Sequence, residues 1–555
     1  MTVRRWIAVL VSIGVISAPA LLSAGSVSSA ETLPSDRQDL LAKVEASPLS
    51  LWMSGPAKRA LDALAGVQSE PHAPRSRVAS RTSRQSISSI APNVRVNDPS
   101  GDGLGDPDMT TQSETSVAAS GKHVVVAYND DGHSPLFLEP KVDLSGYSWS
   151  ADGGKTFHDS RLPNKLPGNN IGDPGVATDR SGHFYYSTLD LDFSTPLLGV
   201  AVGRSDDHGR TFHKPTIVSR KTGFITTPTT DSFVTTDKPW ITVGADPADR
   251  SRDVIYASWT EDYFFDTRRT FGQGTRIMLA SSRDHGMTWS RPQVVVDDPI
   301  SQHDEFHNIF HFVSGSNITV DSSGHVYVAW ERFADNGTFT YPTRQEWVAR
   351  SSDRGETFQR QSLMASPSAV GTVSAPLACP NVLQFGPGRY VRTQEFPMIG
   401  IGPDGAVFVT YNSGDGPGRS SIRVARSDDG ARTWFTKTVR SHATAFMPAL
   451  AANAHGVDVV YYEQTSKRTM KTAIATSHDG LSYSKHDLSS ATFAMPVTLP
   501  PFDPSTAPCY MGDYLGATRL GSTTYTAWGD NRDTVKNAFW PKGRPDPNVY
   551  FAKVS

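Results

Sequence analysis

The sequence of 555 residues is poor in cysteine, in net charge and in long apolar runs, and each shortage excludes a class of protein. Its two cysteines are too few for a disulfide-rich scaffold or a four-thiolate metal site. Because 53 basic residues nearly balance 56 acidic ones, the net charge of −3 gives no positive field to attract nucleic acid or anionic lipid. The one apolar run that approaches membrane-spanning length lies at the N-terminus. We therefore expect neither nucleic acid nor a membrane as a partner of the mature chain.

The N-terminal run has the organisation of a signal peptide. Arg4 and Arg5 precede an apolar stretch, and small residues then lead into Glu31. Serine, glycine and proline interrupt the stretch, which favours cleavage over a permanent anchor. Residues 1–30 are therefore predicted to be a signal peptide, and the mature protein is predicted to be secreted and extracellular.

Residues 31–90 precede a region of repeats and divide into two parts. The first part carries apolar residues at helical spacing, including Leu40 and Val44. The second part, from Val67, is rich in serine, arginine and proline, which is typical of a flexible linker. We predict a helical pro-segment followed by a linker, with the folded domain at residues 91–555.

A short segment of the form Ser-x-Asp-x-Gly-x-Thr-aromatic recurs six times. Serine and aspartate side chains bond to turn amides and glycine supplies a positive φ, so the segment is typical of a turn between two strands. The copies begin at Ser150, Ser205, Ser282, Ser351, Ser427 and Ser477. The fifth copy has Ala431 where glycine is expected, and the sixth is one residue short.

Short β-rich segments surround these turns and form seven similar units. Four-stranded units that repeat at roughly fifty to seventy residues are typical of propeller blades. The seventh unit ends after its third strand, at Asn548–Val554, and an unpaired strand at Asn93–Asn97 precedes the first unit. We therefore predict an all-β, single seven-bladed propeller whose ring is closed by the N-terminal strand, with six blades as the alternative.

These turns and strands resemble the sialidase-like Asp-box (BNR-repeat) propeller superfamily, over residues 114–555. The resemblance implies secreted proteins that cleave or bind glycans, often exo-sialidases with three arginines, an acidic proton donor and a Tyr/Glu nucleophile pair. Two features depart from the sialidase pattern. No Arg-Ile-Pro segment precedes the first turn, although Arg161-Leu162-Pro163 follows it, and we count seven units where sialidases have six blades.

Five inner strands begin with a carboxylate near the expected central funnel, on the face opposite the repeated turns. Crowded carboxylates raise one another's pKa, and this leaves a proton donor beside an anion, as glycosidases require. The same crowd would suit Ca²⁺, and each carboxylate would equally serve to cap a loop or pair with a cation. The candidate catalytic residues are Glu114, Asp173, Asp237, Glu395 and Asp513, with Tyr514 as a nucleophile or a sugar platform.

The candidate substrate-binding residues are cations and one histidine on the same face. Arginine holds a carboxylate through two parallel hydrogen bonds, which suits an acidic sugar, although a single loop arginine is more often a solvated charge. The candidates are Lys238, Arg268, Arg269, Arg392, Arg532 and, from a cluster of three histidines at intervals of four residues, His307. The histidine cluster lacks the H-E-x-x-H pattern, and the aspartates at 98–108 lack the spacing of an EF-hand.

Cys379 and Cys509 lie in the long connections before the fifth and seventh inner strands. Because these connections share a face, we predict a disulfide between them. The predicted function is a secreted, monomeric, sialidase-like glycoside hydrolase that needs no cofactor and acts on extracellular glycans, including acidic ones. The alternative is a non-catalytic propeller that binds glycan or protein and is stabilised by Ca²⁺.

Overall fold

The protein is described by a computed structural model. It describes residues 35–45, 47, 53–54, 57–58, 61, 90–99, 111–130, 143–164, 168–192, 197–222, 224–227, 230–267, 271–299, 310–335, 343–370, 373–375, 379–386, 389–393, 395–416, 418–496, 509–536 and 541–555. The predicted signal peptide and almost all of the predicted linker lie outside these residues. In the described part of the chain, no helix has both the length and the apolar character needed to cross a membrane.

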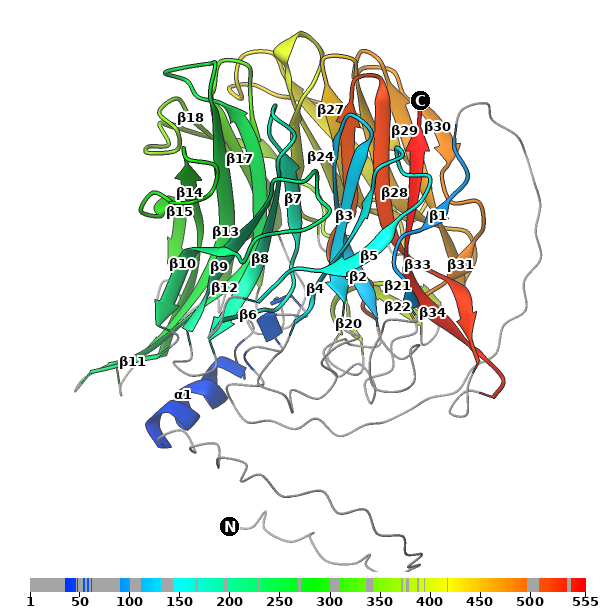
Figure 1. Ribbon diagram of the computed structural model, residues 1–555. Coiled ribbons are helices and arrows are strands. Elements are labelled where there is room, and N and C mark those ends of the chain that lie inside the picture. The colour runs from blue at the N-terminus through cyan, green and yellow to red at the C-terminus, as the bar shows by residue number, and fades with distance from the viewer. Residues whose placement is uncertain are drawn as a thin grey trace, which may run out of the picture.

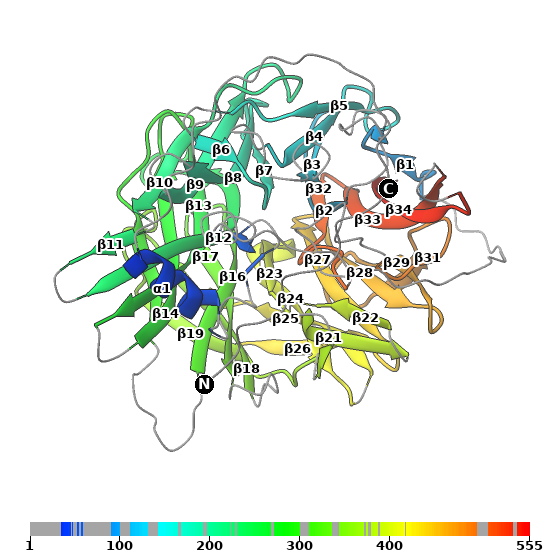
Figure 2. The ribbon, with the colours of Figure 1, turned by 90° about the horizontal axis from the view of Figure 1, so that it is seen from below.

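Seven antiparallel sheets surround a central axis as the blades of a propeller (Figures 1 and 2). Blade 1 contains β2 (Gln112–Ser120), β3 (His123–Asp130), β4 (Ser145–Ser150) and β5 (His158–Arg161). Blade 2 contains β6 (Gly168–Asn170), β7 (Gly175–Thr178), β8 (Phe184–Asp192), β9 (Leu197–Ser205) and β10 (Thr216–Thr222). Blade 3 contains β11 (Phe224–Thr226), β12 (Asp231–Ala245), β13 (Asp253–Asp266), β14 (Phe271–Ser282) and β15 (Gln293–Pro299).

The remaining blades continue the same order from the axis outward. Blade 4 contains β16 (Phe310–Val320), β17 (Val326–Asp335), β18 (Thr343–Ser351) and β19 (Arg360–Ala365). Blade 5 contains β23 (Met398–Ile401), β24 (Val407–Gly414), β25 (Ser420–Ser427) and β26 (Phe435–Arg440). Blade 6 contains β27 (Ala445–Asn453), β28 (Gly456–Gln464), β29 (Thr469–Ser477), β30 (Ser484–Asp487) and β31 (Phe493–Ala494). Blade 7 contains β32 (Gly516–Leu520), β33 (Thr523–Val535) and β34 (Arg544–Val554).

The N-terminal strand completes the last blade. β1 (Val94–Arg95) pairs antiparallel with β34, where Val94 lies opposite Phe551. The amide of Val96 extends this pairing by donating to the carbonyl of Val549 at 2.9 Å. The first and last parts of the domain are thereby joined, which removes an exposed sheet edge. The predicted seven-bladed ring and its closure by the N-terminal strand are confirmed, and the six-bladed alternative is wrong.

The repeated Ser-x-Asp segments join the third and outer strands of blades 1 to 6. In the first copy, the hydroxyl of Ser150 accepts the Gly154 amide at 2.9 Å. The carboxylate of Asp152 accepts the amides of Lys155 and Thr156 at 2.9 and 3.0 Å. The Gly153 amide in turn donates to the Lys122 carbonyl, between β2 and β3, at 2.8 Å. These turns therefore lie at the end of the inner strands, and the strands begin on the opposite face, which we call the funnel face.

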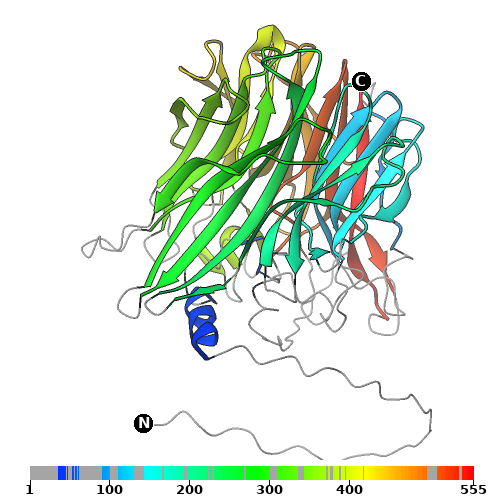
Figure 3. The same cartoon turned by 60° about the vertical axis from the view of Figure 1, so that its left-hand side comes forward.

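Two further elements lie on the funnel face. A small sheet contains β20 (Val373–Ala375), β21 (Cys379–Gly386) and β22 (Arg389–Arg392), between blades 4 and 5 in the sequence. The helix α1 (Ser35–Glu45) precedes the propeller. It lies against β12, which with β13 extends beyond the neighbouring blades toward the helix (Figure 3).

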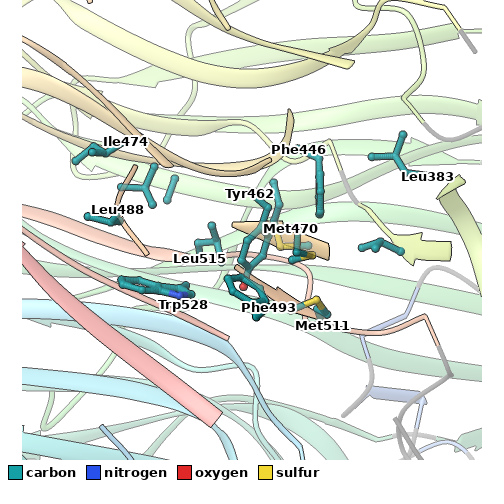
Figure 4. Packing of buried hydrophobic residues seen from close by; sticks show 14 of the residues in the cluster. Leu383, Phe446, Tyr462, Met470, Ile474, Leu488, Phe493, Met511, Leu515 and Trp528 are labelled. Atoms are coloured by element: carbon teal, nitrogen blue, oxygen red, sulfur yellow. The ribbon is translucent and has the colours of Figure 1, made fainter. Parts of the chain in front are cut away.

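Apolar side chains fill the space between neighbouring blades. The cluster between blades 6 and 7 also includes Leu383 of the small sheet, which lies on the same side of the cluster as Phe446 (Figure 4). Trp528 and Leu515 join it from blade 7 and its entry. Burying side chains of this size stabilises by about 1.5–3 kcal/mol each. The small sheet is thus fixed to the propeller core, and this positions the residues of β22.

Candidate functional site

The inner strands of blades 1 to 3 start with an unusual backbone conformation. Glu114, Asp173 and Lys238 have backbone φ values of 52°, 55° and 51°. Residues other than glycine rarely adopt this region. The strand register shifts at these points in blades 1 and 3, as in a β-bulge. A bulge turns side chains away from the regular pleat, and such strain costs about 1–3 kcal/mol per residue and gathers at functional sites. The same positive φ and register shift occur at Gly315 and Met447 in blades 4 and 6, so the bulge belongs to the repeat, and blades 1 to 3 differ in placing a charged residue there.

Four of the five predicted carboxylates come together at these bulges. Glu114 accepts the amide of Asp513 at 3.1 Å and the side-chain amide of Asn129 at 2.8 Å. Asp173 accepts the amide of Lys238 at 3.1 Å. Asp237 precedes Lys238 in the same bulge, and all four carboxylates are at most 2% exposed. We call Glu114, Asp173, Asp237 and Asp513 the funnel carboxylates.

Two cations lie among the funnel carboxylates. The ammonium of Lys238 lies 2.7 Å from Asp237 and 3.6 Å from Asp513. A guanidinium nitrogen of Arg392 donates to Asp513 at 2.9 Å. Burial alone would raise the pKa of Asp237, but the charge of Lys238 outweighs it and holds this pKa below its usual value. Asp237 is therefore ionised.

Asp173 interacts with two other acids and takes the opposite protonation state. Burial and the negative charges of Glu114 and Asp237 raise the pKa of Asp173 well above its usual value. Burial and the charge of Asp513 also raise the pKa of Glu114. The funnel therefore holds an acid whose pKa is raised beside an acid whose pKa is lowered, an arrangement that general acid–base catalysis uses.

A tyrosine that the sequence did not single out belongs to the same group. The hydroxyl of Tyr510 donates to Glu114 at 2.5 Å, and the guanidinium of Arg392 lies 5.6 Å from the centre of its ring. The predicted Tyr514 instead packs edge-on against Trp240 and donates to the carbonyl of Pro174 at 3.2 Å. The signal that would have found Tyr510 is its position next to Cys509.

Cys509 holds this part of the funnel in place. It is disulfide-bonded, and Cys379, at the start of β21, is the only other cysteine in the chain. Its carbonyl accepts the amide of Arg392 at 2.8 Å. A disulfide between these loops would join the strand next to Arg392 to the loop that carries Tyr510.

The fifth predicted carboxylate, Glu395, belongs to a separate buried cluster. Arg344 lies 2.6 Å from Glu331 and 2.7 Å from Glu395, and all three side chains are fully buried. Glu346 lies opposite Glu331 on the adjacent strand and is equally buried. Arg344, Glu331 and Glu346 were not among the predicted residues, although the charged Glu331 and Glu346 next to Trp330 and Trp347 in apolar strands were the available signal.

Glu331 should make the stability of the protein depend on pH. Burial raises its pKa to about 8, against the opposing effect of Arg344. The folded state therefore binds a proton more tightly than the unfolded state, so stability is highest below the usual pKa of glutamate and is lost as pH rises through 8. We expect Glu331→Gln to be nearly neutral at pH 5 and stabilising by about 1–3 kcal/mol at pH 8.5. Denaturant unfolding of both chains at the two pH values checks this, and an equal effect at both would contradict it.

Of the other predicted binding residues, the structure describes Arg532, which pairs outside the funnel carboxylates. Arg532 pairs with Asp530 at 2.6 Å and lies 4.1 Å from the ring of Tyr550, in the blade that closes the ring. Arg268, Arg269 and His307 lie outside the described residues. Among the residues that the structure describes, Arg392 is thus the single arginine shown in contact with a funnel carboxylate, and no arginine triad is seen.

A possible metal-binding group lies on the other face, in the described part of blades 2 and 3. Ligand atoms of Asp179, His183 and His285 lie within 4.8 Å of one another. Asp179 and His183 are 2.7 Å apart, and the same pairing recurs at 2.8 Å between Asp321 and His325 in blade 4. Because the pair recurs where no third histidine joins it among the described residues, it is explained as part of a turn.

Comparisons with known proteins find only distant structural similarities. No family model matches the chain, and no curated protein is significantly similar. A structure of unknown function from Dyadobacter fermentans is 13% identical over 84% of this chain and 100% of its own, with a TM-score of 0.39. An α-L-arabinofuranosidase from Fusarium graminearum is 14% identical over 67% and 93% of the two chains, with a TM-score of 0.41. A Trypanosoma rangeli sialidase is 8% identical over 80% and 55%, with a TM-score of 0.36. The similar structures thus include an α-L-arabinofuranosidase and a sialidase, and none of them determines a substrate.

Residues of the N-terminal segment cover the funnel carboxylates. The amide of Ser54 donates to Asp237 at 2.9 Å. The carbonyl of Met53 accepts a hydrogen bond from Arg392 at 2.9 Å. Since this carbonyl and this amide belong to one peptide group, Arg392 and Asp237 hold its two opposite sides.

Proposed function

We propose that this protein is a secreted, sialidase-like glycoside hydrolase of the Asp-box type, with the funnel as its active site. The observation that carries the proposal is the buried cluster of Asp173, whose pKa is raised, and Asp237, whose pKa is lowered, next to the hydrogen-bonded pair of Tyr510 and Glu114. The cluster offers an acid, an anion and a tyrosine hydroxyl that donates to a carboxylate able to take its proton, while burial and the charge of Glu114 raise the pKa of Tyr510 well above its usual value.

The roles follow from the protonation states. Asp173 donates its proton to the glycosidic oxygen as the bond from that oxygen to the anomeric carbon breaks. Tyr510 attacks the anomeric carbon and passes its proton to Glu114, as the use of tyrosine in place of a carboxylate nucleophile requires. Water, deprotonated by Asp173, then cleaves the bond between the sugar and Tyr510, and Glu114 returns its proton to the tyrosine.

The substrate is proposed to be an extracellular glycan with a polar or acidic group. Arg392 and Lys238 are the described cations placed to bind that group. A single arginine gives weaker selection for a carboxylate than a triad would, so neutral sugars belong among the substrates to be tested.

A non-catalytic glycan-binding propeller is the second candidate. It is favoured by the hydrogen bonds that Glu114 and Asp173 accept from backbone amides of neighbouring blades, since these bonds give both residues a structural role. Binding and turnover must therefore be measured together.

The test is turnover of a panel of fluorogenic glycosides, including a sialoside and an arabinofuranoside. On a substrate that is hydrolysed, we expect Asp173→Asn to lower kcat about 10²–10⁴-fold, the usual value of general acid catalysis. Tyr514→Phe is the matched control and should retain activity, because its hydroxyl binds a carbonyl outside the carboxylates. Full activity in Asp173→Asn would overturn the assignment. Binding on a glycan array with no turnover would support the binding propeller.

A further inference from the structure

The described residues of the N-terminal segment between 35 and 61, namely 35–45, 47, 53–54, 57–58 and 61, dock on the funnel face through an apolar surface. Leu40, Leu41 and Val44 of α1 are at most 2% exposed, and so are Met53, Ala57 and Leu61. They share one cluster with side chains of β8, β12, β13, β16 and β17, including four phenylalanines. Figure 2 shows α1 across the strands of blade 3, to one side of the ring's centre. The segment is therefore packed as part of the folded protein.

The polar contacts of the segment are made with the funnel itself. The peptide group between Met53 and Ser54 lies between Arg392 and Asp237. The segment thus contacts Arg392 and Asp237 directly. Arg392 in turn binds Asp513, and Asp237 binds Lys238, so both cations and two acids of the site are linked to the segment. An incoming ligand would need these same donors and acceptors.

We propose that residues 35–61 form an intramolecular plug that keeps the funnel closed, and that a ligand reaches the funnel carboxylates only when the plug is displaced. The meaning of the plug for catalysis rests on the proposed function. The docking itself does not, because it follows from the apolar cluster and the two hydrogen bonds alone.

The plug is built so that it can undock from the funnel face. Helix α1 has 11 residues, and isolated helices shorter than about 12–15 residues are marginal in water. The helix should therefore unfold when it undocks. At its rim it is held by an ion pair between Lys43 and Asp266, but Lys43 is half exposed and such pairs contribute little. The apolar side chains thus supply most of the docking free energy.

Val44→Asp is the variant that should release the plug. Val44 is fully buried at the plug interface, so an aspartate there places an unpaired charge in an apolar cluster. In the full chain, hydrogen exchange of the amides in Ser35–Glu45 should be slow in the wild type and at least about 100-fold faster in Val44→Asp, because undocking unfolds the helix. Leu61→Asp should behave in the same way.

A labelled peptide of residues 35–61 provides the second measurement. The wild-type funnel is already filled by its own tethered plug, which acts at an effective concentration near the millimolar range. The peptide should therefore bind Val44→Asp at least about 10-fold more tightly than it binds the wild type. Leu520→Asp is the matched control, because Leu520 is exposed on β32 and is absent from the plug cluster. The Leu520→Asp variant should bind the peptide with the same affinity as the wild type.

Two outcomes would overturn the plug. One is equal exchange of the α1 amides in the wild type and Val44→Asp, and the other is equal or absent peptide binding in both chains. Neither measurement uses turnover, so both remain informative if the protein is not an enzyme. If Val44→Asp binds the peptide but hydrolyses none of the glycosides, the plug stands and the proposed function fails.

Discussion

Arg344→Met is expected to destabilise the protein by about 3–5 kcal/mol, the usual cost of removing one partner from a buried ion pair. Arg344 lies within 2.7 Å of Glu331 and Glu395, and all three side chains are fully buried. Methionine keeps an unbranched apolar side chain in place of the arginine's methylene stem but carries no charge. At least one glutamate would then have to remain as an uncompensated buried anion or take up a proton. Denaturant unfolding at pH 7 measures the loss.

Variants of two neighbouring residues test whether the loss comes from the buried charge or from any substitution in blade 4. Arg332→Met is the matched control, because Arg332 follows Glu331 on the same strand but is one-third exposed beside Asp298. It should cost less than about 1 kcal/mol, as exposed ion pairs do. Glu346→Gln should also cost little, because burial and the charge of Glu331 raise the pKa of Glu346 so far that it is already neutral. Equal losses for Arg344→Met and Arg332→Met would contradict the argument.

The fold was predictable because its information is local and repeated. Six copies of one turn, each bonded internally as in Ser150 to Thr156, set a period that only a ring of similar sheets explains. The closing strand at Val94–Arg95 was predictable for a different reason. The seventh unit lacked an outer strand, and an unpaired β segment elsewhere in the chain supplied it.

The candidate site was predictable in part. Glu114 and Asp173 occupy equivalent positions in the first and second units, and Asp237 and Asp513 lie one residue earlier in the third and seventh, so the repeat itself placed them near one axis. Their protonation states were not predictable in detail, because these depend on distances between blades. Tyr510 and the Met53–Ser54 peptide group reach the funnel from irregular segments that have no counterpart in the other units. Nothing periodic marks such residues.

The plug also explains an otherwise costly feature of the funnel. Four carboxylates, one lysine and one arginine are nearly inaccessible to water in the structure. Burying such groups is unfavourable unless each finds partners. The plug supplies an amide to Asp237 and a carbonyl to Arg392, which satisfies two of these groups while the site is closed. Displacing the plug would expose them to water or to a ligand with the same hydrogen-bonding groups.

Loss of the disulfide is the second change expected to have a large effect. Cys509→Ser should destabilise the protein by about 3–5 kcal/mol, because a cross-link between Cys379 and Cys509 closes a loop of about 130 residues and so restricts the unfolded chain. It should also loosen the funnel, since the carbonyl of Cys509 binds the amide of Arg392 and the next residue is Tyr510. Unfolding in denaturant, with and without a reductant, measures the first effect.

The single and double variants determine whether the cross-link causes this loss. Cys379→Ser, Cys509→Ser and the double variant should lose the same free energy, because each removes one and the same bond. If a buried hydroxyl at Cys509 were the cause instead, Cys379→Ser alone would be milder and the losses would add. Reductant should destabilise the wild type and leave all three variants unchanged. Mass spectrometry of the non-reduced protein gives the direct answer, and two free thiols would contradict the disulfide and its role in holding Tyr510 at the funnel.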